Sequence, residues 1–456
     1  MCEHGNVAYK TINATEESSV NEGFSGLEED SVDFVLITVG LNKSVTPLNN
    51  FEDYSKVVDI NVLGCVIPIK VLVERKIVSR GAKIVVIGST SGHFAGGALD
   101  PYSVSKWILV NECSSLQHEL SHRGISLKVV NPRTIKNVRS EYFRTSNGIN
   151  VDSVVSKVLS SGYQCFCPWY YGAFHFIERT NSWLFDRAFG LPLYCFRSKN
   201  YQSELNTILI TGASSGLGKE LAYRFAGQCK TMYLAARNQE ALNDIKKELS
   251  TYPCEVIPLM LDLSSYESVK EVSMSLKGID LIINNAGQQV QGSILNTDVE
   301  LYRKSIRINC LSHILLTAEL LKQEYQPKCI VNVLSTTAVS GRANLGIYSS
   351  PKAGLWAWTK VLRRNYGKKI NVIEVIPATF KSGLHKKGVS VLTNSDNQGK
   401  SFVSSSKMGF TSKDVSEKVY KGICSRRDKI LIPSFKVRAF IILEALMPNI
   451  FRRMFS

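Results

Sequence analysis

Tyr348 and Lys352 are a pair of residues whose types and spacing could do chemistry. A phenol can donate a proton to the alkoxide that forms when a ketone is reduced. Residues four positions apart share one face of a helix, so the Lys352 ammonium is expected to lower the pKa of the Tyr348 phenol from ~10 towards neutrality. The alternative is an ordinary surface pair on a helix, which is the commoner origin of this spacing. The pair therefore needs support from other motifs.

A glycine-rich segment, TGASSGLG at 211–218, lies between the strand-like run TILI and the helical pattern KELAYRFAG. Glycines in such a loop permit a tight turn and close approach of the backbone to a pyrophosphate, while the following helix contributes its positive amino-terminal dipole. A glycine triplet alone is a weak signal, and a plain helix-entry turn is the alternative. The candidate phosphate-binding residues are Gly212, Ser214, Ser215, Gly216, Leu217 and Gly218.

Arg237 follows the next strand-like run, in MYLAARN. Sites for NAD usually place an acidic residue about 20 residues after the glycine loop, where it holds the ribose 2′-hydroxyl. An arginine at this point suits a 2′-phosphate instead, so the sequence favours NADP(H) over NAD(H). The alternative is that Arg237 is a solvated surface charge.

Together with these motifs, Asp262 in MLDLSS, the NNAG segment at 284–287, Asn309 and Ser335 resemble the short-chain dehydrogenase/reductase family. The resemblance covers the whole second half of the chain. It implies that Ser335 orients a substrate carbonyl, and that Asn309 holds a water linking Lys352 to solvent. It also implies that Lys352 holds the nicotinamide ribose. The expected catalytic residues are Asn309, Ser335, Tyr348 and Lys352, and the further cofactor-binding residues are Arg237, Asp262, Asn285, Ala286, Gly287, Tyr348 and Lys352.

Pro351 lies inside the YSSPK segment, where the family more often has a small residue. A proline has no amide hydrogen and its ring obstructs the preceding turn, so it is tolerated at the start of a helix. Pro351 is therefore expected in the first helical turn.

The two halves of the chain repeat each other. KIVVIGSTSG (83–92) parallels CIVNVLSTTA (329–338), and YSVSK (102–106) parallels YSSPK (348–352), with the same offset for both pairs. The segments ending at Asn61 and Asn309 pair at almost the same offset, so the chain is interpreted as a tandem duplication. The boundary is placed in a polar stretch at 191–206, giving domains at 1–195 and 196–456. The first half then holds a second tetrad: Asn61, Ser89, Tyr102 and Lys106.

The first half has no counterpart of the glycine-rich loop. FVLITVG (34–40) matches LIINNAG, and YKTINATEESSV already resembles PLMLDLSSYESV. The first domain is therefore expected to be truncated at its amino terminus and to lack a cofactor. Two explanations stay open: a degenerate partner that stabilises an intramolecular pseudo-dimer, or a truncated reading frame. Further oligomerisation stays open as well.

Each half alternates short β-branched runs with helix-length amphipathic stretches. This alternation predicts an α/β protein with two tandem doubly wound Rossmann-type parallel sheets and helices on both faces. The second half alone supplies six such runs: TILITG, TMYLAA, EVIPLML, LIINNAG, IVNVLS and INVIEVI.

Composition narrows the class of protein. The 456 residues suffice for two domains, and a hydrophobic fraction of 44% with no low-complexity tract predicts a folded chain. The eleven cysteines are scattered, which favours reduced thiols and a cytoplasmic protein without a secretory signal. Cys165, Cys167 and His175 lack a fourth ligand, so no metal site is expected.

The net charge of +16 raises the question of an anionic partner. No basic helix or aromatic-basic sheet motif points to nucleic acid. Basic pairs flank the apolar run VRAFIILEALMPNIF, so the segment 437–455 either contacts a membrane surface peripherally or packs against the aromatic stretch WYYGAFHFIERTNSWLF. The polar stretch from Phe380 to Met408 is interpreted as a lid over the substrate.

The expected function is that of an NADP(H)-dependent oxidoreductase interconverting a ketone and a secondary alcohol, on a small lipophilic substrate such as a steroid, retinoid or ketosphinganine-like compound. The alternative is a catalytically silent scaffold or dinucleotide sensor built from the same domains. Turnover that depends on the cofactor distinguishes the two.

Overall fold

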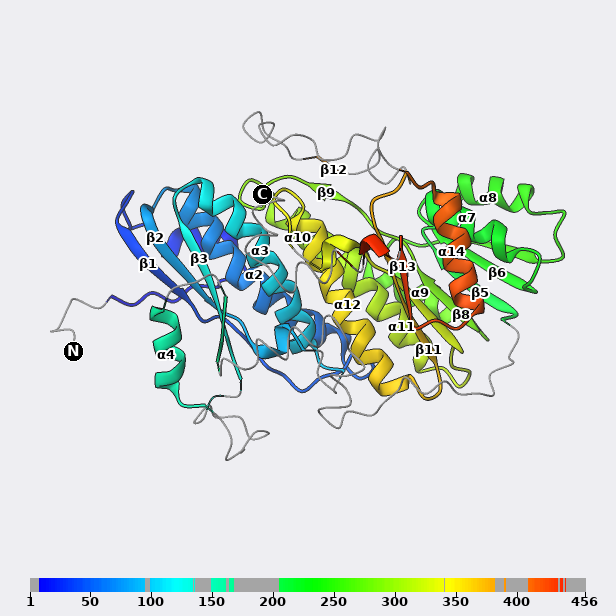
Figure 1. Cartoon of the computed structure of the whole chain (residues 1–456), viewed down its shortest axis with the longest axis horizontal. Helices are drawn as coiled ribbons and strands as arrows, with labels where there is room; N and C mark the ends of the chain where they lie inside the picture. Colours follow the sequence, from blue (N-terminus) through cyan, green and yellow to red (C-terminus); the bar gives the residue numbers. More distant parts are fainter. Residues whose placement is uncertain are drawn as a thin grey trace.

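In the computed structural model the chain folds around two parallel β-sheets (Figure 1). The structure describes residues 8–94, 99–133, 135, 149–160, 164–167, 205–339, 341–381, 389–390, 409–433, 435–437 and 439. Among these residues no helix is long and apolar enough to cross a membrane. No group of His, Cys, Asp or Glu side chains in the same residues could hold a metal ion.

The second half forms a seven-stranded sheet in the order β13-β11-β10-β8-β5-β6-β7, with every pair of neighbours parallel. Six of these strands are the expected β-branched runs, and β13 is a seventh that the sequence analysis did not identify. The strands are β5 (Thr207–Thr211), β6 (Thr231–Ala236), β7 (Glu255–Met260), β8 (Leu281–Asn284), β10 (Cys329–Val333), β11 (Asn371–Pro377) and β13 (Lys429–Ile432).

Helices cover both faces of this sheet because its strands alternate apolar side chains between two cores. Ile208 and Ile210 of β5 pack with α7, α8 and α14, whereas Leu209 packs with α9, α11 and α12. The helices are α7 (Gly216–Phe225), α8 (Gln239–Glu248), α9 (Tyr266–Ser275), α10 (Val299–Ile306), α11 (Ser312–Leu321), α12 (Gly346–Tyr366) and α14 (Ser412–Cys424). Shorter elements are β9 (Val290–Gln291), β12 (Val389–Ser390), the π-helical turn η2 (Arg307–Leu311) and the 3₁₀ turn η3 (Thr336–Ala338).

The first half forms a four-stranded parallel sheet in the order β1-β2-β3-β4. This order matches β8-β10-β11-β13 of the second half, and the described residues hold no counterpart of β5, β6 and β7. The elements are α1 (Glu17–Gly23), β1 (Val32–Ile37), α2 (Phe51–Glu74), β2 (Val78–Ile87), the 3₁₀ turn η1 (Thr90–Gly92), α3 (Pro101–His122), β3 (Ser126–Pro132), α4 (Val151–Leu159) and β4 (Gln164–Cys167).

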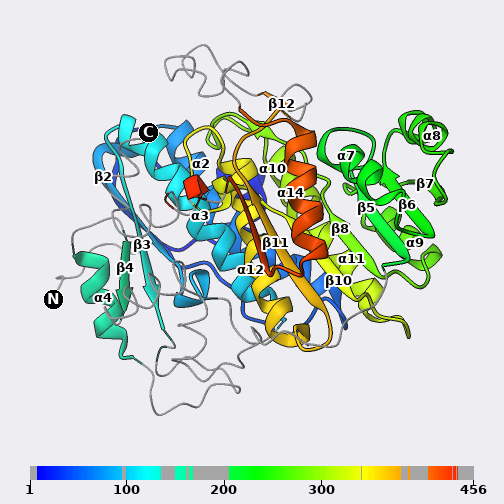
Figure 2. The same ribbon diagram turned by 45° about the vertical axis from the view of Figure 1, so that its right-hand side comes forward.

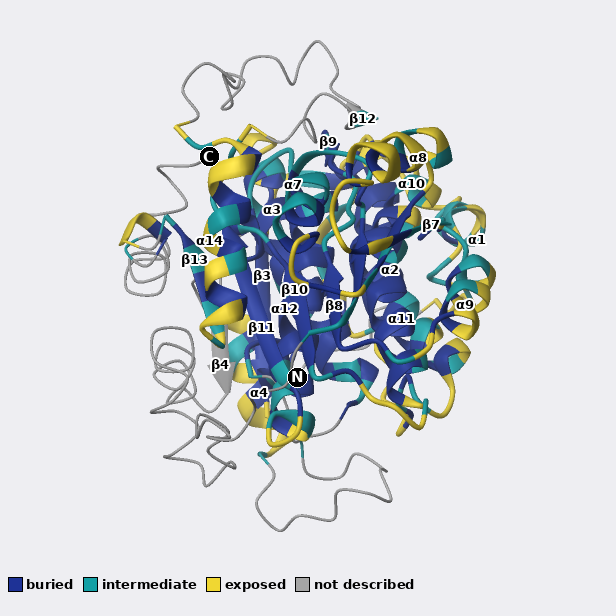
Figure 3. Ribbon diagram, turned by 90° about the vertical axis from the view of Figure 1, so that its right-hand side faces the viewer, coloured by how far each residue is buried: buried dark blue, intermediate teal, exposed yellow. Residues whose placement is uncertain are grey.

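The two halves meet along α3 and α12, which lie side by side in the middle of the molecule (Figures 1 and 2). A Cβ on Gly354 of α12 would lie 2.5 Å from Cγ1 of Ile108, so glycine lets the two helices approach closely. Trp107 and Trp356 meet edge to face, with ring centroids 5.5 Å apart. One apolar cluster continues from the first half into the second, and Figure 3 shows α2, α11 and α12 as largely buried.

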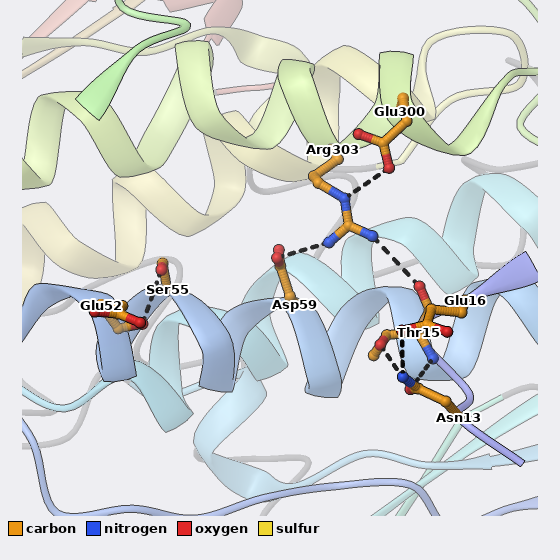
Figure 4. Close-up of polar contacts among 8 residues, drawn as sticks. All are labelled: Asn13, Thr15, Glu16, Glu52, Ser55, Asp59, Glu300 and Arg303. Atoms are coloured by element: carbon orange, nitrogen blue, oxygen red, sulfur yellow. Dashed lines mark hydrogen bonds and ion pairs between the residues drawn. The ribbon is translucent and has the colours of Figure 1, made fainter. Parts of the chain in front are cut away.

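A polar contact adds to this packing between α2 and α10 (Figure 4). The guanidinium of Arg303 donates to the carboxylate of Asp59 at 2.7 Å and to the carbonyl of Thr15 at 3.3 Å. Glu300, one turn earlier on α10, accepts from Nε of the same side chain at 3.1 Å. Arg303 therefore joins its own helix to the first half.

The expectation for Pro351 was wrong. Helix α12 begins at Gly346, so Pro351 lies inside it, beyond the first turn. A proline there cannot donate to the carbonyl of Ile347, but Ser305 Oγ donates to that oxygen at 2.6 Å. The hydroxyl of a neighbouring element thus replaces the backbone bond that the proline removes.

Candidate active site

The glycine-rich loop connects β5 to α7, next to the point where the strand order reverses between β5 and β8. Ligands of open parallel sheets bind beyond the carboxyl ends of the strands at this switch point. Gly212 and Gly216 both have positive φ, at 66° and 58°. A Cβ on Gly218 would lie 2.4 Å from the carbonyl oxygen of Gly212, so only glycine fits this turn.

The start of α7 has the features of an anion site. Ser215 is the N-cap of the helix, but its side chain makes no capping hydrogen bond. The side chains of Ser214 and Ser215 are half-buried at the loop, and Leu217 is buried beneath it. Backbone amides at a helix start that no side chain satisfies are suited to a phosphate group.

The NNAG segment is fastened to the glycine loop. Thr211 Oγ1 accepts from the amides of Asn285 at 3.0 Å and Ala286 at 3.1 Å. In return, Asn285 Nδ2 donates to the carbonyl of Thr211 at 2.9 Å. Thr211 was not among the expected site residues, although it is the first residue of the TGASSGLG segment.

Arg237 and Asp262 follow β6 and β7 at the same edge of the sheet. Arg237 is exposed and forms no ion pair with another described residue. Burial tends to raise the pKa of Asp262, but hydrogen bonds from Ser264 and the charge of Arg237 outweigh it and hold the pKa below its usual value. The pair offers a cation for a phosphate and a fixed carboxylate for an adenine, although both roles are expectations.

Lys352 is buried and points at the carboxyl end of β10, where its Nζ donates to the carbonyl of Val333 at 3.0 Å. A Cβ on Gly287 would lie 3.5 Å from this Nζ and 3.0 Å from Oδ1 of Asn309. Burial lowers the pKa of Lys352 to about 8. The lysine, the asparagine and the end of the NNAG segment therefore converge.

Asn309 lies in η2, a π-helical turn between α10 and α11. Its side chain pairs with the backbone of Gln288, accepting from the amide at 3.0 Å and donating to the carbonyl at 2.9 Å. Because both ends of the amide group are engaged, Asn309 fixes the segment after NNAG. A water held by Asn309 stays a prediction.

Tyr348 and Ser335 face each other, from α12 and from the start of η3. Burial raises the pKa of Tyr348 to about 12, and a hydrogen bond with Ser335 acts in the opposite direction. We expected Lys352 to lower the pKa of Tyr348, and this expectation was wrong for the chain without a bound cofactor. Desolvation of the phenolate dominates and raises the pKa instead. The phenol is protonated at neutral pH.

His313 is a second residue of the site that was not expected from the sequence. It is fully buried on α11, and its Nε2 lies 2.9 Å from the carbonyl oxygen of Ala286. Burial and the charge of Lys352 lower the pKa of His313 to about 3, so the ring is neutral and Nε2–H can donate to that carbonyl. One indication of this role was present in the sequence, which is that His313 follows Asn309 by four residues.

The first half repeats this geometry. Asn61 accepts from the amide of Leu41 at 2.6 Å and donates to its carbonyl at 3.0 Å, as Asn309 does with Gln288. Lys106 Nζ donates to the carbonyl of Ile87 at 3.2 Å, the counterpart of the bond from Lys352 to Val333. Ser89 caps η1 as Ser335 caps η3, and Tyr102 lies on α3 beneath Lys106.

Three expectations from the sequence concern residues that lie wholly or partly outside the described ranges. Cys165 and Cys167 belong to β4, but His175 lies outside the described residues. The same is true of most of the expected lid from Phe380 to Met408 and of nearly all of the segment 437–455. These expectations stay predictions.

Comparison with known proteins gives matches in both halves. A family model described as short chain dehydrogenase matches residues 3–147 and 206–391. An NADP-dependent 3-hydroxy acid dehydrogenase of Schizosaccharomyces pombe is 32% identical over 238 residues, which cover 50% of this chain and 89% of that protein. Dehydrogenase/reductase SDR family member 7B of Xenopus laevis is 29% identical over 263 residues, which cover 54% of this chain and 79% of that protein. A solved structure of a short chain dehydrogenase/reductase of Burkholderia phymatum, in complex with NAD, is 22% identical and has a TM-score of 0.48. The match covers 55% of this chain and 97% of that one.

Proposed function

Because this chain belongs to the short chain dehydrogenase family, we propose that it is an NADP(H)-dependent oxidoreductase whose second half interconverts a ketone and a secondary alcohol. The observation that carries the proposal is that Tyr348 faces Ser335 while Lys352, one helical turn further along α12, lies beside Gly287. Relatives described as NADP-dependent support the choice of cofactor, among them the 3-hydroxy acid dehydrogenase. Arg237 supports the same choice, because its guanidinium, exposed and unpaired among the described residues, can bind the 2′-phosphate that distinguishes NADP(H) from NAD(H).

The residues present fit a dinucleotide. Gly212 and Gly218 keep the loop free of side chains, and the amides at the start of α7 would hold the pyrophosphate. Arg237 would bind the 2′-phosphate, and Asp262 would border the adenine. Bound NADPH supplies a hydride. Lys352 would hold the nicotinamide ribose.

The protein's own part in the reaction is to place the carbonyl and supply a proton. Ser335 donates a hydrogen bond to the substrate oxygen, which aligns it with the hydroxyl of Tyr348. As negative charge develops on that oxygen, Tyr348 transfers its proton to it. A phenol with a pKa of about 12 is fully protonated at neutral pH, which suits the direction of ketone reduction.

The substrate is proposed to be small and lipophilic. The apolar run within 437–455 and the basic pair Arg452 and Arg453 support this proposal, because such a segment can lie at an anionic membrane surface. The first half is proposed to be a structural partner without a cofactor, forming an intramolecular pseudo-dimer through α3 and α12. The close approach of α3 and α12 at Gly354 and the contact of Trp107 with Trp356 support this role.

The test measures oxidation of NADPH and of NADH with a panel of ketones of increasing apolar surface. We expect turnover with NADPH, a preference for apolar ketones and little turnover with NADH. Arg237→Asp should shift the preference towards NADH, while Arg123→Asp, at an exposed arginine of the first half, is the matched control. Equal use of both cofactors by the natural chain, unchanged in Arg237→Asp, would overturn the cofactor assignment, and binding without turnover would favour a dinucleotide sensor.

A further inference from the structure

Cys229 and Cys254 form a buried pair that the proposed reaction does not use. Their sulfur atoms lie 2.9 Å apart, and both side chains are less than a tenth exposed. Cys229 lies two residues before the start of β6, and Cys254 directly precedes β7. The amide of Glu255 donates to the carbonyl of Lys230 at 2.8 Å, so the two strands are already fastened at this end.

A disulfide has a sulfur separation of about 2.05 Å, so closing this pair requires a movement of less than one ångström. The pair lies at the edge of an apolar core, while the neighbouring residues Gln228, Lys230, Pro253 and Glu255 are exposed. A small displacement of these two surface turns would therefore admit a small oxidant.

We propose that Cys229 and Cys254 are a site of reversible oxidation, joined as a disulfide by a peroxide. One thiolate attacks a peroxide oxygen, which forms a sulfenic acid and releases hydroxide, or an alkoxide from an organic peroxide. The second thiol then attacks the sulfenic sulfur and water leaves. With hydrogen peroxide, two thiols and one peroxide give one disulfide and two molecules of water. A small thiol reductant reverses the reaction.

Either thiol can react first. The two sulfur atoms share one hydrogen bond, in which either can be the donor. Burial raises the pKa of both thiols, which makes the pair slow to react and stable in its reduced form. Whichever thiol forms the sulfenic acid, the other lies within reach to resolve it.

The disulfide would close a loop that contains β6 and α8. Arg237 lies in this loop, at the opposite end of β6 from Cys229. The cross-link would therefore hold the outer edge of the sheet together without reaching the phosphate site. We expect the oxidised protein to unfold at a higher temperature and to keep its affinity for NADPH.

The experiment treats the full chain with hydrogen peroxide at mildly alkaline pH, blocks the remaining thiols and maps the peptides by mass spectrometry. We expect a peptide pair linked through Cys229 and Cys254, lighter by two hydrogen atoms than the reduced pair and separated by dithiothreitol. The exposed Cys424 shows when the oxidant has acted, since it is modified first. Cys229→Ser should leave Cys254 trapped as a sulfenic acid, detectable with dimedone.

Thermal unfolding gives an independent measurement. Oxidation should raise the melting temperature of the natural chain and leave that of Cys229→Ser unchanged. Modification of Cys424 with both Cys229 and Cys254 still free would overturn the proposal, and so would a disulfide that joins either cysteine to another partner. An equal temperature shift in Cys229→Ser would also overturn it.

Discussion

Glu112 reaches from the first half to the helix that carries Tyr348 and Lys352. It is fully buried, accepts from the hydroxyl of Tyr302 at 2.5 Å and from that of Ser350, and keeps its second oxygen without a partner. Burial raises the pKa of Glu112 to about 8, even though both hydrogen bonds act against this rise. At neutral pH the group is therefore mostly a protonated acid.

This shift predicts how stability depends on pH. The folded pKa lies above the unfolded value, so folding takes up a proton, and the contribution of Glu112 to stability is full below the unfolded pKa. It is lost as pH rises through the folded pKa, at up to about 1.4 kcal/mol for each pH unit. In urea unfolding, the stability of Glu112→Gln relative to that of the natural chain should therefore rise between about pH 5 and pH 8. The exposed Glu28→Gln should follow the natural chain, and a difference between Glu112→Gln and the natural chain that does not change over this range would refute the shift.

The helix that carries Tyr348 and Lys352 was predictable from the sequence, but the electrostatics of the proposed site were not. The spacing of Tyr348 and Lys352 placed both on one helix, as the structure shows. The pKa of Tyr348 depends on how the surrounding segments desolvate it, which no local pattern encodes. His313 and Thr211 were missed for a similar reason, because each acts by holding a backbone segment that is distant in sequence.

At the scale of elements, α12 serves two purposes at once. One face presents Tyr348 and Lys352 to the site, and another packs on α3 through Gly354 and Trp356. Six of the seven strands in the second sheet were predicted because each is a compact β-branched run. The strand β13 was missed, since its four residues lie in the basic stretch RRDKILI, which shows no clear period.

Gly354 provides the test of this packing. Gly354→Val would place new atoms against Ile108, where a Cβ alone already lies 2.5 Å away. Overpacking of this kind should cost about 1–3 kcal/mol of stability and also lower turnover, because α12 must shift and carries Tyr348 with it. Gly409→Val is the control, since nothing lies within 4 Å of its Cβ position. Urea unfolding and NADPH oxidation measure both effects, and a Gly354→Val protein with natural stability and turnover would disprove the close approach.

At the scale of the whole molecule, the two halves share one apolar cluster and a repeated site geometry, but only the second carries a glycine-rich loop among the described residues. The repeat was visible in the sequence because identical motifs recur at one offset. The way the halves pack was not, since contacts such as Asp59 with Arg303 join residues with no common pattern.

Because only the second half carries a glycine-rich loop among the described residues, we expect one cofactor site per chain. Calorimetric titration with NADPH should give a single site, and Gly218→Val should abolish binding because a Cβ there meets the carbonyl of Gly212 at 2.4 Å. Removal of residues 1–190 should expose the apolar face of α12 and cause aggregation, so the second half would not be stable by itself. Two sites per chain would contradict the role proposed for the first half.

The most direct measurement compares Tyr348→Phe with Tyr102→Phe, which remove the same hydroxyl from the two repeats of one geometry. Each variant is assayed for NADPH oxidation with an apolar ketone and for NADPH affinity. We expect Tyr348→Phe to lower turnover by ~10² or more with nearly unchanged affinity, which is the scale of lost general acid catalysis, while Tyr102→Phe keeps natural turnover. Retained activity in Tyr348→Phe, or a large loss in Tyr102→Phe, would contradict the assignment of the chemistry to the second half.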